Sequence, residues 1–274
     1  MDSCKGCLTG IRWHVMVLET TQALVLEIRE YRETSLLVTL LTPEHGRLGA
    51  VARGARRPKS SLACLLQPFN LLQVRLSLSS AGGLANLNGA DLLCQPAYSR
   101  AAAQDALARI AYAALAAEVL AQGQENDPHG EDLFWIAKAF FAGLEAAEHP
   151  GSFALTGLFE ILAALGYAPH VGPVVSPSSS TGRKCYVDTV GGTLRGPDVP
   201  AGPNDFPLSG ADLQALRRVC ASTVTGPEPP PLVSKRSGRI LMRLVIRLFE
   251  VQLERSLRGA RFLEEMVLSR PSRS

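Results

Sequence analysis

Short segments of alternating apolar and polar residues fill the region from residue 23 to residue 93. The clearest covers 72–78, where every second residue is Leu or Val and the residues between are Gln, Arg and Ser. A period of two is typical of a strand with one buried face. Similar segments at 24–29, 36–41, 47–53 and 84–87 bring the expected strands to five. Five short strands predict a small closed barrel, because closure removes the exposed edges of an open sheet.

Alanine-rich helical segments replace the strands after Pro96. Ser99 and Ser209 are candidate N-caps, and Gly123 and Gly166 are candidate helix stops. Residues 169–207 are rich in Pro, Gly and Ser and contain a candidate hairpin at 185–194. The expected helices are 99–122, 131–148, 152–165, 209–223 and 233–257.

The expected fold class is α+β and multidomain. An N-terminal small β-barrel, for which the oligonucleotide-binding (OB) fold is the natural candidate, precedes an α-helical C-terminal domain. The expected divisions are an N-terminal extension at 1–20, the barrel at 21–96, the helical domain at 97–267 with a loop segment at about 169–207, and a tail at 268–274.

Cations gather at the end of one expected strand and in the loop after it. From Arg47 to Lys59 the sequence has five cations and no acid. Gly54 permits a sharp turn there, and Pro58 stiffens the loop. Arginine guanidinium groups suit phosphate oxygens, and backbone amides of a glycine-rich turn add neutral donors. We expect this loop to contact a phosphate backbone; the alternative is a solvated loop that binds nothing.

A second set of cations lies on the last expected helix. Residues 232–274 carry a net charge of +6, whereas residues 98–170 carry −6. Arginines at 236, 239, 243 and 247 follow a helical spacing and form one basic stripe beside an apolar stripe that must be buried. The stripe continues to arginines 255, 258 and 261. Such a track suits either a nucleic-acid strand or an acidic peptide tail of a partner, and the sequence leaves both open.

Sequence signatures of catalysis are missing. The chain has no GxSxG, HExxH or Walker A motif and no GxGxxG after a strand, so we expect no catalytic residues and no cofactor. Cys4 and Cys7 form a CxxC pair that supplies only half of a tetrahedral zinc site, so no metal is expected. No apolar run reaches the length of a membrane span. Six scattered cysteines predict a reduced, cytoplasmic protein.

Four motifs in a fixed order give the chain a resemblance to a known family. They are 29–35 (REYRETS), 42–47 (TPEHGR), 52–56 (ARGAR) and 66–69 (LQPF). This set resembles the N-terminal barrel of the RecO family of bacterial recombination mediators. Residues 162–169 (LAALGYAP) and 257–263 (LRGARFL) resemble elements of its C-terminal domain, so the match spans about residues 22–267.

The resemblance implies an OB barrel followed by a helical domain, without enzymatic turnover. It also implies binding to single- and double-stranded DNA, annealing of complementary strands, and loading of recombinase onto strands coated by single-strand-binding protein. The implied partners are RecR, the acidic C-terminal tail of single-strand-binding protein and, indirectly, recombinase; the implied location is cytoplasmic and nucleoid-associated. An interaction adaptor that captures an acidic peptide is the alternative.

On this basis DNA backbone contact is assigned to Arg53, Arg56, Arg57 and Lys59, with Arg29 and Arg47 in support. The second basic surface, for DNA or an acidic tail, comprises Lys235, Arg236, Arg239, Arg243, Arg247, Arg258 and Arg261. Aromatic residues are sparse in the expected barrel, mainly Tyr31 and Phe69, which predicts binding with little sequence preference.

One departure from the family concerns zinc. Many members carry a four-cysteine zinc module just after the LGY-x-P element. The corresponding segment here keeps only Cys185, so we expect a degenerate, zinc-free loop at about 169–207.

Overall fold

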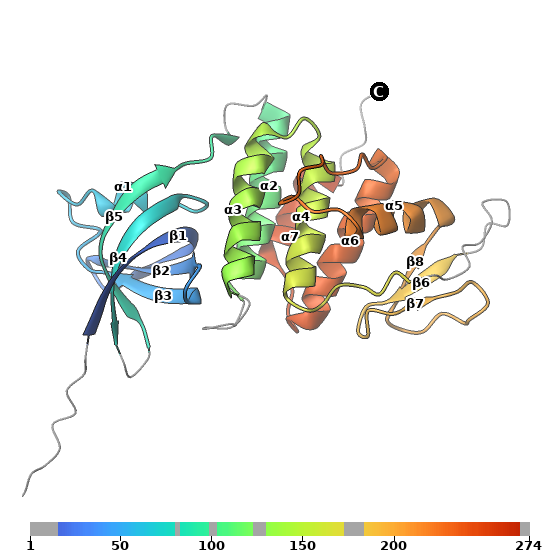
Figure 1. Cartoon of the computed structure of the whole chain (residues 1–274), viewed down its shortest axis with the longest axis horizontal. Helices are drawn as coiled ribbons and strands as arrows, with labels where there is room; N and C mark the ends of the chain where they lie inside the picture. Colours follow the sequence, from blue (N-terminus) through green and yellow to red (C-terminus); the bar gives the residue numbers. More distant parts are fainter. Residues whose placement is uncertain (1–15, 80–82, 99–102, 123–129, 173–183, 269–274) are drawn as a thin grey trace, which may run out of the picture.

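The structure is a computed structural model that describes residues 16–79, 83–98, 103–122, 130–172 and 184–268. A β-barrel lies at one end of the molecule, a bundle of helices in the middle, and a small sheet at the other end (Figure 1). The predicted order, with an N-terminal barrel followed by helices, is confirmed.

Five strands close the barrel in the order β1-β2-β3-β5-β4. Neighbouring strands are antiparallel except for β3 and β5, which are parallel. A five-stranded barrel of this kind is an OB fold. The strands are β1 (Met16–Tyr31), β2 (Ser35–Thr42), β3 (Gly46–Ala52), β4 (Leu71–Ser79) and β5 (Ala85–Cys94).

Strand β1 begins at Met16, earlier than the boundary at residue 21 that the sequence indicated. The reason is its length: residues 16–24 pair with β4, and residues 24–31 pair with β2. Residues 16–20 therefore belong to the barrel rather than to an extension. The strand also has two buried faces where it meets the helices, because Ala23 and Val25 lie in the barrel core while Leu24 and Leu26 join the helical core.

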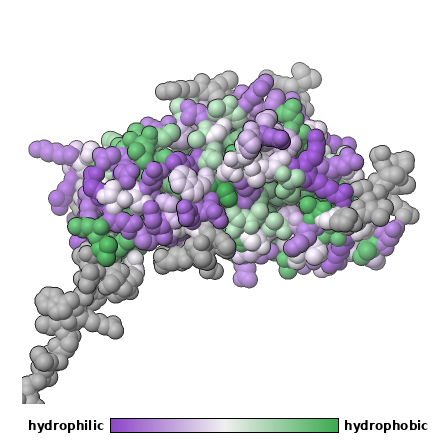
Figure 2. Space-filling model, in the orientation of Figure 1, coloured by the Kyte–Doolittle hydropathy of each residue, from purple (hydrophilic) through white to green (hydrophobic). Residues whose placement is uncertain are grey.

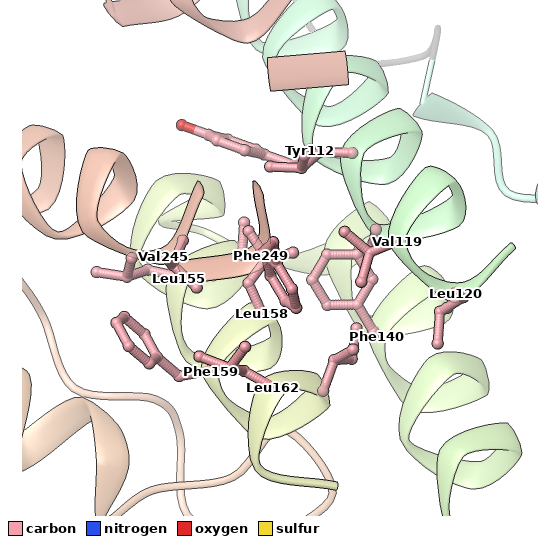
Figure 3. Packing of buried hydrophobic residues seen from close by; sticks show 14 of the residues in the cluster. Tyr112, Val119, Leu120, Phe140, Leu155, Leu158, Phe159, Leu162, Val245 and Phe249 are labelled. Atoms are coloured by element: carbon pink, nitrogen blue, oxygen red, sulfur yellow. The ribbon is translucent and has the colours of Figure 1, made fainter. Parts of the chain in front are cut away.

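The helical bundle surrounds a core of phenylalanine and leucine side chains (Figure 3). Phe140, Phe249 and Leu158, from three different helices, point toward one another there. The apolar stripe predicted from the sequence on the second helix, at positions 134, 137, 141 and 144, is fully buried. The helices are α1 (Leu62–Leu65), α2 (Ala103–Leu120), α3 (Gly130–Ala146), α4 (Pro150–Ala164), α5 (Gly210–Cys220), α6 (Lys235–Gln252) and α7 (Arg258–Leu263), followed by a π-helical turn at Glu264–Leu268.

Helix α3 packs directly on the barrel. A Cβ atom on Gly130 would lie 2.6 Å from the Cα atom of Gly46, so the first turn of α3 touches the backbone at the start of β3. Farther along, Lys138 Nζ donates a hydrogen bond of 3.0 Å to Gln22 Oε1 on β1. These contacts set the position of the barrel against the helices.

The last long helix is shorter than predicted. It ends at Gln252 instead of reaching residue 257, and α7 starts at Arg258. Glu254 adopts φ = +52°, and the amides of Glu254 and Arg255 donate to the carbonyls of Val251 and Glu250. This is the hydrogen-bond pattern of a Schellman C-cap. The prediction failed because glycine is the usual signal for that conformation, and here glutamate adopts it.

The small sheet has the order β7-β6-β8, and its predicted hairpin is confirmed by the pairing of β6 (Cys185–Asp188) with β7 (Leu194–Arg195). Strand β8 (Asp205–Leu208) pairs with the other edge of β6. Arg195 lies between two carboxylates, 3.3 Å from Asp188 and 3.6 Å from Asp205. The side chain of Asp205 is almost fully buried, so this charged group links all three strands.

Burial of one cysteine thiol and two tyrosine phenols predicts that the protein loses stability at alkaline pH. Burial raises the pKa of the Cys220 thiol and of the Tyr112 phenol, each to about 12, and it also raises the pKa of Tyr98, which donates to the carbonyl of Phe141. The unfolded chain therefore loses these protons at a lower pH than the folded chain. Above about pH 9 the free energy of unfolding should fall, by up to about 1.4 kcal/mol per pH unit for each group.

Urea denaturation between about pH 8 and pH 11 measures this effect. The Cys220→Ala variant should show a shallower pH dependence than the wild type, whereas Cys64→Ala, at an exposed thiol, should match the wild type. A free energy of unfolding that stays constant over this range would contradict the prediction.

Candidate nucleic-acid interface

A hollow of about 650 Å³ opens at the end of the barrel where β1 turns into β2. The end of β3 and the start of β5 complete its wall. Three arginines line it, namely Arg32, Arg53 and Arg57, together with Glu33 and the neutral side chains of Tyr31, Leu84 and Asn86. Much of the barrel surface is hydrophilic in Figure 2. The loops between strands 1 and 2 and between strands 4 and 5 are those that bind oligonucleotides in OB folds.

A backbone hydrogen bond joins the β1–β2 turn, which carries Arg32, to the loop after β3, which carries Arg53, Arg56 and Arg57. Arg32 adopts φ = +55° in the β1–β2 turn, and its guanidinium lies 5.2 Å from the centre of the Tyr31 ring. Gly54, with φ = +70°, turns the chain after β3. The amide of Arg56 then donates a 3.0 Å hydrogen bond to the carbonyl of Thr34. The hollow is therefore formed by fixed backbone rather than by a free loop.

The predicted loop cations fall into two groups. Arg53, Arg57 and Lys59 are exposed, and within the described part of the chain none of them forms an ion pair. Arg56 differs, because its guanidinium lies 2.9 Å from the carboxylate of Glu30 on β1. The run at 47–59 contains no acid, but folding brings the acid of a different strand against Arg56.

The two supporting residues lie elsewhere. Arg47 is at the start of β3 and Arg53 follows its end, and a strand of this length separates them by about 20 Å. Arg47 is thus beside the contact with α3 and not in the hollow. Arg29 lies on β1, paired with Glu27 at 2.8 Å, and lines a crevice between barrel and helices.

The predicted C-terminal basic stripe is also divided. Lys235 and Arg239 line a groove of about 280 Å³ beside the apolar side chains of Val233, Met242 and Val267. Arginines 236, 243 and 247 are exposed on the outer side of α6. Arg258 lines the crevice near the barrel, and Arg261 is exposed, with its guanidinium donating to Ser256 Oγ. Helices α6 and α7 therefore present these cations to three different surroundings.

Arg32 and Asn86 belong to the hollow but were missed as site residues. Arg32 is outside the basic run of 47–59, and Asn86 carries no charge. The signal that would have found Arg32 is its place in the first hairpin turn of a barrel whose binding loops are known. Only the pairing of β2 with both β1 and β3 places that turn beside the end of β3.

Within residues 16–268, gaps excepted, no three His, Cys, Asp or Glu side chains are grouped as metal ligands would be. No helix in the same part of the chain is long and apolar enough to cross a membrane. Cys4 and Cys7 lie outside the described residues.

Comparison with known proteins supplies the family. The family model described as "Recombination protein O N terminal" matches residues 16–95, the whole barrel. The DNA repair protein RecO of Anaeromyxobacter dehalogenans strain 2CP-C is 31% identical over 247 residues, covering 88% of this chain and 94% of the relative. That of Laribacter hongkongensis is 34% identical over 211 residues, covering 71% and 76%. That of Methylococcus capsulatus is 54% identical over 69 residues, 25% of this chain and 28% of the relative. Because the similarity to the first relative extends over nearly its whole length, this chain belongs to the RecO family.

Proposed function

We propose that this protein acts in DNA repair by binding the phosphate backbone of single-stranded DNA in the hollow of its barrel. The observation that carries the proposal is the group of three arginines, 32, 53 and 57, at the binding loops of an OB barrel. Guanidinium groups bind phosphate oxygens through paired hydrogen bonds, and such phosphate contacts carry no direct information on base sequence. The relatives named as DNA repair proteins support the same role.

The same arrangement suits annealing of complementary strands. Two phosphate chains repel each other until cations neutralise them, while the base edges must stay free to pair. The hollow offers cations and one aromatic ring, Tyr31, which already lies beside the Arg32 guanidinium. It can therefore hold a strand by its backbone and leave its bases exposed. We extend the proposal to loading of recombinase onto strands coated by single-strand-binding protein, with RecR as a partner.

A fluorescence annealing assay tests this function. Two labelled complementary strands are mixed with and without single-strand-binding protein, and the protein should speed pairing in both cases. Acceleration of bare strands alone would restrict the function to annealing. No acceleration in either case would refute the proposal.

The groove at the start of α6 favours a second role, the capture of an acidic peptide. Lys235 and Arg239 supply positive charge at its rim, and Val233, Met242 and Val267 supply apolar surface. An acidic tail that ends in an apolar residue fits both features. We propose the C-terminal tail of single-strand-binding protein as this ligand.

Charge reversal separates this role from DNA binding. The variant with Lys235→Glu and Arg239→Glu should bind a fluorescent tail peptide at least about tenfold more weakly, since two attractive charges become repulsive. Its annealing of bare strands should stay near the wild-type rate. Arg218→Glu, at an exposed arginine of α5 outside the groove, is the matched control. Equal peptide binding by the variant and the control would remove the groove as the peptide site.

A further inference from the structure

A crevice of about 290 Å³ between the barrel and the helices brings together cations that are far apart in the sequence. Arg29 comes from β1 of the barrel, Arg255 from the turn between α6 and α7, and Arg258 from the first position of α7. Its remaining walls include Pro68 and Phe69 from the barrel side, alanine side chains from α2 and its end, and two carboxylates, those of Glu27 and Glu118. Neither the basic run at 47–59 nor the basic stripe of the last helix predicts that Arg29, Arg255 and Arg258 lie in one crevice.

The segment that carries Arg255 and Arg258, from the α6–α7 turn to the start of α7, is held firmly in place. The carboxylate of Glu118 on α2 accepts hydrogen bonds from the amides of Arg258 and Gly259, at 3.0 and 2.7 Å. The guanidinium of Arg255 donates to Gln122 Oε1 at 2.7 Å. Both arginines are nevertheless exposed. The Arg255 guanidinium and the backbone of Arg258 are therefore held in place before an anion binds, and the Glu118 carboxylate on α2 accepts from backbone amides rather than from these guanidinium groups.

The barrel side adds a third cation above an apolar surface. The side chain of Arg29 is 64% exposed, and Glu27, at 2.8 Å, sets the orientation of its guanidinium. Phe69 adopts φ = +73° and stacks on Phe141 with ring centres 5.5 Å apart, which fixes its ring at the barrel–helix contact. The crevice therefore combines three cations at its rim with a rigid apolar floor.

Strand β1 connects this crevice to the hollow of the barrel. Arg29 lines the crevice and Tyr31 lines the hollow, and residues two apart on a strand lie on the same face about 7 Å from each other. A ligand that repeats a negative charge along its length can occupy both places at once. A short acidic peptide can occupy only one of them.

We propose that the crevice binds the phosphate backbone of single-stranded nucleic acid whose adjoining segment lies in the barrel hollow. The strand then passes from the barrel onto the helical part, and Arg29, Arg255 and Arg258 contact phosphates. This inference rests on the proposed function. It adds the direction in which the bound strand leaves the barrel.

Oligonucleotides of two lengths test the path. Oligo-dT of about 8 nucleotides is within the site size of one OB barrel, whereas oligo-dT of about 30 nucleotides exceeds it. Replacing Arg255 and Arg258 with glutamine should weaken binding of the long oligonucleotide about tenfold and leave the short one unchanged. The slope of log affinity against log salt should shrink by about 1.4 for the long oligonucleotide, since about 0.7 is lost per phosphate contact. Arg218→Gln, outside the crevice, should match the wild type for both lengths.

A second variant tests the same site by gain of affinity. Glu27→Gln removes the carboxylate that competes with phosphate for Arg29 and should strengthen binding of the long oligonucleotide about threefold. Long-oligonucleotide affinities that equal the wild-type value in both variants would overturn the inference while leaving the barrel site in place. Weaker binding of an acidic tail peptide, with oligonucleotide binding unchanged, would also overturn it and assign the crevice to peptide. Failure of the wild type to bind either oligonucleotide would instead refute the proposed function.

Discussion

Replacing Arg53 and Arg57 together with glutamate is expected to weaken binding of single-stranded DNA by about 100-fold at low salt. Both side chains line the hollow of the barrel, and neither forms an ion pair within the described residues. Each phosphate contact by a guanidinium is a charge-assisted hydrogen bond of about 1.5–3 kcal/mol, and reversal adds repulsion. Fluorescence anisotropy with labelled oligo-dT measures the change.

Replacing Arg53 and Arg57 together with glutamine tests whether the two guanidinium groups contact phosphates. The salt dependence of log affinity should become shallower by about 0.7 for each phosphate contact removed. Arg75→Gln is the matched control, because Arg75 is an exposed barrel arginine that pairs with Asp91 at 2.5 Å and is not part of the hollow. Arg56→Gln should weaken DNA binding less than the double glutamate or the double glutamine variant of Arg53 and Arg57, since Arg56 is paired with Glu30. An unchanged salt slope in the double variant would exclude the hollow as the DNA site.

Replacing Arg109 with alanine is expected to lower the free energy of unfolding by about 3–4 kcal/mol. Arg109 lies on α2, is only 8% exposed, and donates to the carbonyls of Leu144, Glu145 and Ala147 at the end of α3. Those carbonyls have no partner within α3, so loss of the guanidinium leaves buried acceptors without donors. It also removes a cation from the negative end of the helix dipole.

Urea denaturation followed by circular dichroism measures this loss. Arg109→Lys should recover only part of it, because an ammonium group keeps the charge but cannot reach all three carbonyls in the same geometry. Arg218→Ala, at an exposed arginine, should change stability by less than about 0.5 kcal/mol. A similarly small change for Arg109→Ala would show that the buried guanidinium does not stabilise α3.

Local sequence signals predicted those features that depend on neighbouring residues. The stop of α4 is an example: Gly166 adopts φ = +82°, and Tyr167 donates to the carbonyl of Leu162, as the glycine indicated. The start of α5 is another, with Ser209 and Asp212 forming a capping box. The end of α6 was missed because Glu254 takes a glycine-like conformation. No residue type marked it, and the turn to α7 is held by contacts with α2.

For this protein the sequence alone determined the OB barrel followed by helices, the family resemblance, and the basic character of the loop at 53–59. These follow from strand period, helix caps and local charge, all of which act over a few residues. Only the tertiary structure decided which cations act together. Pairing of β2 with β1 and with β3 joined Arg32 to Arg53 and Arg57 and placed Glu30 against Arg56. Packing of the helices on the barrel put Arg29 and Arg258 in one crevice. The physical reason is that electrostatic interaction depends on distance in space, and folding makes neighbours of charges that the sequence separates.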